Sequence, residues 1–118
     1  MVHLFFLALS LAAPDLEALK REARALARPA GCTQSAQCKL MPLGSRPCGG
    51  PTEFLVYCAS STDEKALEAK ARLATDAEKA KNAARQTLGI CTVLSPPKLK
   101  LDNGQCAAVE VKAAELPM

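Results

Sequence analysis

Cysteine is the residue type with the clearest chemistry in this sequence of 118 residues. The six cysteines are Cys32, Cys38, Cys48, Cys58, Cys91 and Cys106. In a short chain, such residues either pair as disulfides or bind zinc, and a zinc site usually contains a Cys-x-x-Cys pair. No such pair occurs here, and the number of cysteines is even. The sequence therefore predicts structural disulfide cysteines and no metal site.

The N-terminal residues indicate the compartment in which these disulfides form. An apolar run extends from Val2 to Leu11, and Ser10 and Ala12 have the spacing of a signal-peptidase site. The run is too short to span a bilayer, which takes about 20 apolar residues. We expect residues 1–12 to be a signal peptide, cleaved after Ala12 or Ala13, although a buried N-terminal helix is the alternative. The mature protein would then be periplasmic or extracellular, without membrane insertion.

Histidine is absent from the expected mature chain, because the only one, His3, lies in the signal peptide. Catalysis by Ser-His or Cys-His pairs and histidine-ligated metal centres are therefore excluded. Paired carboxylates remain as catalysts in principle, but the acidic residues fall on the solvent-facing sides of the expected helices. The net charge of +3 is scattered and only 3% of residues are aromatic, which argues against nucleic-acid binding. We expect a protein that is not an enzyme and has no cofactor.

The segment around the second and third cysteines is the candidate binding site. Residues 30–51 are rich in cysteine, proline and glycine and lack helical or strand periodicity, so we expect a loop. In one interpretation the loop only braces the start of the next strand, because its prolines fix the chain direction. In the other it is a rigid recognition surface, since pre-organisation lowers the entropic cost of binding. The candidate binding residues are Lys39, Leu40, Met41 and Arg46.

These interpretations correspond to different functions. We favour a small exported protein-binding module of the envelope or the extracellular space, with a protein partner that the sequence does not identify. The alternative is a protease inhibitor that presents the loop between Cys38 and Cys48. The basic and apolar side chains of that loop are of the kinds that protease specificity pockets accept.

An amphipathic helix is expected ahead of this loop, over residues 14–28. Its apolar residues form one stripe, Leu16, Leu19, Ala23 and Leu26. We assign residues 13–31 as an N-terminal helix or leader. A helix that binds a membrane surface or a partner would have the same pattern, but packing on its own domain is the more common use of such a stripe.

A longer helix is expected after the loop, from Thr62 to about Leu88. Ser61 and Glu64 have the capping-box spacing at its start, and Gly89 suits its C-terminal end. Small residues recur at helical spacing, at Ala66, Ala69, Leu73, Ala77, Ala80, Ala84 and Leu88. Because small side chains permit close approach, we expect this face to lie flat on a sheet. A coiled coil would need larger side chains at these positions.

Strands are expected on either side of the long helix, at residues 52–58 and 90–94. The first is expected to be central in the sheet. A right-handed crossover between the two would make them parallel. That arrangement places Cys91, at the start of the second strand, near Cys48, which precedes the first. Cys48–Cys91 is therefore the one disulfide that we predict.

The C-terminal part of the domain has a hairpin pattern. Residues 98–111 alternate polar and apolar side chains around Asn103-Gly104, which is a strong signal for a type I′ turn. The predicted fold class is α+β, with one long helix packed on a small β-sheet, an N-terminal amphipathic helix and stabilising disulfides. The disulfide-stabilised domain is expected to span residues 32–111, and residues 112–118 are a tail.

Four features of this domain together resemble a family of small exported bacterial proteins that has no assigned activity. The features are the GxxPCGGP motif of Gly44–Pro51, the strand Phe54–Tyr57, the helix start Thr62-Asp63 and the NGxC hairpin Asn103–Cys106. The resemblance covers residues 32–107. The family has serine where this chain has Cys58 and cysteine where it has Leu101. The resemblance implies export and this fold, and it implies no activity.

Overall fold

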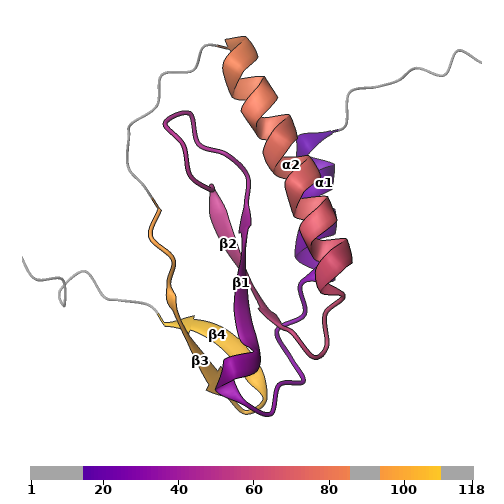
Figure 1. Ribbon diagram of the computed structural model, residues 1–118, viewed down its shortest axis with the longest axis vertical. Coiled ribbons are helices and arrows are strands. Elements are labelled where there is room, and N and C mark those ends of the chain that lie inside the picture. The colour runs from indigo at the N-terminus through magenta and orange to yellow at the C-terminus, as the bar shows by residue number, and fades with distance from the viewer. Residues whose placement is uncertain (1–14, 86–93, 110–118) are drawn as a thin grey trace, which may run out of the picture.

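The computed structural model describes residues 15–85 and 94–109. Its elements are α1 (Leu16–Leu26), the short 3-10 helix η1 (Ser35–Gln37), β1 (Cys38–Leu43), β2 (Glu53–Cys58), α2 (Glu64–Arg85), β3 (Lys98–Asp102) and β4 (Gln105–Val109). The described part of the chain is an α+β domain, as predicted, with one long helix, one short helix and two small antiparallel sheets (Figure 1). The predicted signal peptide, residues 90–93 of the predicted second strand and the tail at 112–118 lie outside the described residues.

β1 is a strand where the sequence had predicted a loop. It pairs antiparallel with β2 over its whole length, from Cys38 opposite Cys58 to Leu43 opposite Glu53. The prediction that residues 30–51 form one loop is therefore wrong for this part. Among the described residues β2 pairs with β1 in a two-stranded sheet. That β2 is central stays a prediction, because nearly all of the strand expected beside it, at 90–94, lies outside the described residues.

Pro42 is tolerated in β1 because of its place in the register. The Ala59 amide donates a hydrogen bond to the Gln37 carbonyl, which continues the β1–β2 ladder by one residue. Hydrogen-bonded pairs alternate along an antiparallel ladder, so Pro42 falls at a position whose N–H would point away from β2. The missing donor costs the ladder nothing, and proline is accepted in edge strands for this reason.

The two faces of the β1–β2 hairpin have different surroundings. On one face, Leu43, Leu55 and Tyr57 pack in the main core with residues of both helices. On the other face, Cys58 belongs to a smaller cluster with Cys32 and Cys106. Figure 1 shows the helices along one side of the hairpin and the β3–β4 hairpin at the end where β1 begins.

α1 follows the predicted apolar stripe and joins the main core. Leu19 and Ala23 are buried, and Leu16 and Leu26 pack against the core at its edge. Asp15 caps the helix, because its side chain accepts a hydrogen bond from the Glu17 amide. α1 lies alongside α2 (Figure 1), so the N-terminal helix packs on its own domain.

α2 starts with a different cap from the predicted one. The Asp63 side chain accepts a hydrogen bond from the Ala66 amide at 3.1 Å, in the geometry of an N-cap. The predicted capping box with Ser61 is wrong. The helix begins two residues later than predicted, at Glu64 and not at Thr62, and the Ser61 hydroxyl donates instead to the Ala30 carbonyl.

The buried face of α2 is rotated from the predicted stripe. Leu67, Ala71 and Ala74 are buried, whereas Leu73 of the predicted stripe is 55% exposed and Ala80 is also exposed. Small residues still form the contact surface, which lets α2 lie close to its neighbours. The prediction was right about the kind of side chain and about Ala77, which packs against the main core, but it was wrong about Leu73 and Ala80.

The β3–β4 hairpin is confirmed. Asn103 and Gly104 both have positive φ, +50° and +77°, as a type I′ turn requires. The hairpin is joined to the segment after α1, since the Gly31 amide donates to the Gly104 carbonyl and the Cys106 amide donates to the Pro29 carbonyl. Neither helix in residues 15–85 has the length and apolar character to cross a membrane.

Candidate functional site

The predicted binding residues lie on β1 and in the turn after it, and not on one loop. Lys39 and Met41 share the face of β1 that meets α2, whereas Leu40 lies on the opposite face because side chains alternate along a strand. Arg46 follows the strand, and its amide donates to the Gly50 carbonyl. The structure thus brings Lys39 and Met41 together and separates them from Leu40 and Arg46.

A groove of about 390 Å³ lies between β1 and α2. Its lining residues are Met41, Pro42, Glu68, Ala71, Arg72 and Thr75. Ala71 is 2% exposed, so the base of the groove is apolar. Two exposed ion pairs lie on this side of the molecule, Arg72 with Glu68 at 2.9 Å and Lys39 with Glu64 at 3.2 Å. An apolar base with a few polar groups is typical of a binding groove.

A buried ion pair holds the loop that follows β1. Lys20 of α1 and Glu78 of α2 are 2.8 Å apart, and their side chains are only 10% and 14% exposed. The other carboxylate oxygen of Glu78 accepts a hydrogen bond from the Ser45 amide at 2.7 Å. Glu78 therefore connects both helices to the loop, and with Lys20 it forms what we call the polar clasp.

Electrostatics in the polar clasp favour the charged form of Glu78. Burial alone would raise the pKa of its carboxyl group. The hydrogen bonds from Lys20 and from the Ser45 amide outweigh burial, and the net result is a pKa below the ordinary value for glutamate. The clasp therefore contains two opposite charges at neutral pH.

Further polar contacts fix the same loop to α2. The Thr75 hydroxyl accepts a hydrogen bond from the Gly44 amide at 3.1 Å, and Asn82 donates to the Ser45 carbonyl at 2.7 Å. Gly44 has a φ of +86°, and a side chain there would collide with Thr52 and Glu78. The loop is held by its backbone, so its position does not depend on bulky side chains.

The residues of the clasp were not found from the sequence. Lys20 directly follows Leu19 of the apolar stripe, which places it at the edge of the buried face of α1. The sequence gives only two indications of this ion pair: a basic residue at that edge of α1 and an acidic residue beside the buried face of α2. Whether the two residues pair depends on how the two helices pack, which the sequence alone does not show.

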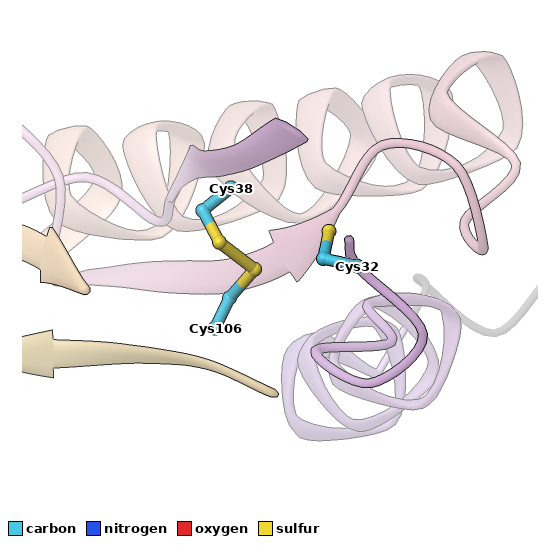
Figure 2. A group of neighbouring side chains, drawn as sticks. All are labelled: Cys32, Cys38 and Cys106. Atoms are coloured by element: carbon cyan, nitrogen blue, oxygen red, sulfur yellow. A yellow bond between two sulfur atoms is a disulfide. The ribbon is translucent and has the colours of Figure 1, made fainter. Parts of the chain in front are cut away.

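Four cysteines form two neighbouring disulfides at the opposite end of the β1–β2 hairpin. The bonds are Cys32–Cys58 and Cys38–Cys106. Figure 2 shows Cys32 beside the Cys38–Cys106 bond, and the Sγ atoms of these three residues all lie within 4.8 Å of one another. We call the four residues the sulfur cluster. The prediction that they form disulfides is confirmed.

The disulfide pairing differs from the one that the predicted inhibitor loop would need. Cys38 is bonded to Cys106, so no disulfide closes the segment from Cys38 to Cys48, as a framed inhibitor loop would need. Cys48 is itself disulfide-bonded. Its predicted partner, Cys91, lies outside the described residues.

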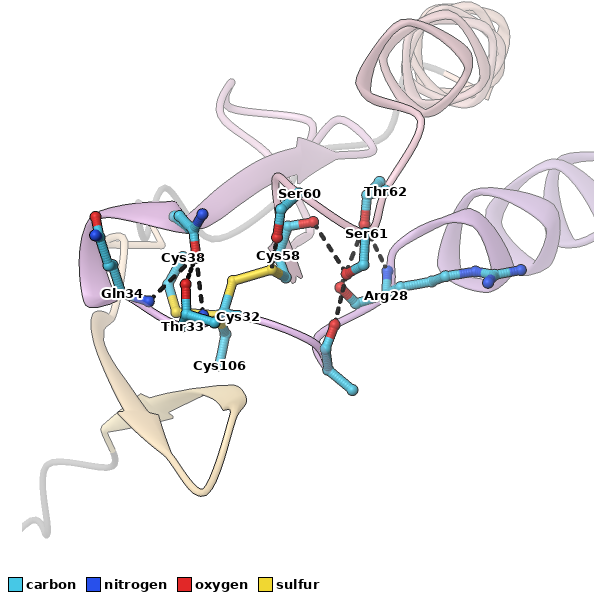
Figure 3. Close-up of a disulfide and its surroundings, with 12 residues drawn as sticks. Arg28, Cys32, Thr33, Gln34, Cys38, Cys58, Ser60, Ser61, Thr62 and Cys106 are labelled. Carbon is cyan, nitrogen blue, oxygen red and sulfur yellow. Dashed lines mark hydrogen bonds between the residues drawn. A yellow bond between two sulfur atoms is a disulfide. The ribbon is translucent and has the colours of Figure 1, made fainter.

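Three hydroxyl residues follow Cys58 in the chain, and the first of them lies beside the Cys32–Cys58 bond (Figure 3). The Ser60 hydroxyl is 3.0 Å from the Sγ atom of Cys58. The Thr62 hydroxyl accepts a hydrogen bond from the Arg28 amide at 3.0 Å. Together with the Ser61 bond to Ala30, these contacts tie the segment after β2 to the segment after α1.

Comparisons with known proteins add no assignment to this site. No protein family matches the chain, and neither a curated protein nor a solved structure that resembles it is found.

Proposed function

We propose that this chain is a small exported protein-binding module without enzymatic activity, and that it binds its partner in the groove between β1 and α2. The groove carries the proposal, because it combines an apolar base with a charged rim. Lys39 and Met41, two of the residues expected to bind, lie on this side of β1. Export is supported by the disulfides, which persist in oxidising compartments.

The occupant that fits this groove is an extended segment of a partner protein. Among the described residues β1 has a strand neighbour only on the β2 side. By the alternation of the ladder, the N–H and C=O groups of Leu40 point to the other edge. A segment that adds to this edge gains main-chain hydrogen bonds, and one apolar side chain can enter the groove.

Selection of peptides on the full-length protein tests this proposal. Linear peptides from a random displayed library are selected on the immobilised wild-type protein. Their binding is then measured on the double variant Glu68→Arg, Arg72→Glu. This variant keeps an ion pair along the helix but reverses the charges of the rim, so its stability should stay close to that of the wild type.

We expect selected peptides to bind the double variant at least about tenfold more weakly, because like charges then meet across the interface. Leu73→Ser is the matched control, since Leu73 is exposed on the same helix but does not line the groove. Its peptide binding should be unchanged. Peptides that bind all three proteins equally would show that the groove is not the recognition site.

Inhibition of proteases is the weaker function for this chain. The segment Lys39–Met41 is paired with β2, and its odd-numbered residues face α2. A protease needs access to an extended inhibitor backbone, and a paired strand does not offer it on both sides. We therefore propose the groove, and not the turn that contains Arg46, as the binding site.

A further inference from the structure

The sulfur atoms of the cluster differ in their access to solvent. Cys32, Cys58 and Cys106 are 4%, 0% and 5% exposed, whereas Cys38 is only partly buried. Cys38 is thus the most exposed residue of the four and the one that an external thiol reaches most readily. The three sulfurs that lie within 4.8 Å of one another belong to two different bonds, so a thiolate released from one bond lies beside the other.

We propose that the sulfur cluster is a thiol–disulfide exchange site. An external thiol attacks Cys38, and exchange within the cluster leaves the resulting thiolate on Cys58. In the first step the external thiolate forms a bond with the Cys38 Sγ atom, and the Cys38–Cys106 bond breaks. The electron pair of that bond remains on Cys106, which becomes a thiolate. The co-reactant is a low-molecular-weight thiol or the dithiol of an oxidoreductase, and access selects the sulfur that it attacks.

The second step takes place within the chain. The Cys106 thiolate attacks the Cys32 Sγ atom, a Cys32–Cys106 bond forms, and the Cys32–Cys58 bond breaks. The electron pair passes to Cys58, so the number of disulfide bonds is unchanged in this step. The Ser60 hydroxyl is 3.0 Å from the Cys58 sulfur and is placed to donate a hydrogen bond to the departing thiolate.

The exchange changes which segments are joined. Before it, Cys32 holds the C-terminal end of β2 and Cys106 holds the start of β1. After it, Cys32 is bonded to β4, and both strands of the β1–β2 hairpin are released from the cluster. A higher thiol concentration around the protein therefore releases a larger fraction of these hairpins from the cluster.

Limited reaction with reduced glutathione tests the proposal on the oxidised full-length protein. The reaction is stopped with acid and N-ethylmaleimide, and the modified residues and remaining bonds are located by proteolysis and tandem mass spectrometry. We expect molecules that carry glutathione on Cys38, maleimide on Cys58 and a Cys32–Cys106 bond. Glutathione on Cys38 with maleimide on Cys106, and an intact Cys32–Cys58 bond, would overturn the transfer.

Two variants separate the steps. In the double variant Cys32→Ser, Cys58→Ser, transfer is blocked, and maleimide should remain on Cys106. In Ser60→Ala, which keeps both bonds, the ratio of label on Cys58 to label on Cys106 should fall about tenfold, as expected for loss of a hydrogen bond to a charged group. Ser35→Ala, at an exposed position in η1, is the control and should leave the ratio unchanged. An unaltered ratio in Ser60→Ala would contradict the role of its hydroxyl.

Discussion

The two faces of the β1–β2 hairpin are stabilised by different chemistry. On the face toward the helices, its side chains enter a core with five large buried residues, Leu19, Leu43, Leu55, Tyr57 and Leu67. On the other face, at the end where β1 begins, the buried members of the second cluster are all cysteines. A small domain buries too little apolar surface to hold every part by packing, so covalent links replace packing where large apolar residues run out.

The largest effect should come from removing a disulfide at the poorly packed end. Replacing both Cys38 and Cys106 with alanine should lower the free energy of unfolding by about 4 kcal/mol, because the bond joins positions 68 residues apart. Urea denaturation of the oxidised protein measures it. The Cys32–Cys58 bond, with a separation of 26, should contribute slightly less, about 3 kcal/mol. Losses near zero for both pairs would mean that packing also holds this end.

An intermediate effect is expected from overfilling the well-packed side. Ala74 is fully buried on α2, so Ala74→Leu should cost about 1–3 kcal/mol, because no room exists for the larger side chain. Ala80→Leu on the exposed side of the same helix is the control and should change stability by less than about 0.5 kcal/mol. Thermal unfolding of the two variants distinguishes them. Equal effects would show that the face of α2 has been assigned incorrectly.

The smallest effect concerns the polar clasp, which lies in the well-packed half but depends on charge. Glu78→Gln should cost about 1–2 kcal/mol at neutral pH, because the pair with Lys20 is mostly buried and would lose one charge. Denaturation at several pH values measures this cost and its pH dependence. Glu78→Asp, which keeps the charge on a shorter side chain, is the companion variant.

The sign of the pH dependence follows from the lowered pKa of Glu78. Its stabilising contribution is present above the ordinary pKa of glutamate, about 4.3, and is lost as the pH falls through the lower pKa of the folded state. In that acid range the wild type should lose stability relative to Glu78→Gln. Parallel stability curves for the two proteins would show that the clasp does not titrate in this way.

Local patterns predicted the elements that are defined by their own sequence. The stripe of α1, the strand of β2 and the turn at Asn103-Gly104 all require only neighbouring residues, and all are present. β1 was missed because Pro42 and the flanking cysteine and glycine residues indicate a loop. Its strand conformation depends on pairing with β2, which is a tertiary contact.

The candidate site was less predictable than the fold, for physical reasons. Alanine occurs on several sides of α2, so the hydrophobic pattern did not distinguish the side of Ala71 from the side of Leu73. The predicted residue Met41 does line the groove, but Glu68 and Arg72 line it only because α2 presents this particular face. The sequence identified candidate side chains, and the packing of helix on strand determined which of them meet.

The two bonds of the sulfur cluster interleave along the chain, which affects how they form as the chain leaves a ribosome or a translocation pore. Of the four cysteines of the cluster, Cys32 emerges first, Cys38 second and Cys58 third, whereas Cys106 emerges last, long after its partner. An oxidant that joins cysteines in order of appearance would link Cys32 to Cys38, and both native bonds would be blocked. With such an oxidant, correct maturation of a chain with this connectivity requires either delayed oxidation or rearrangement of the early, incorrect bonds.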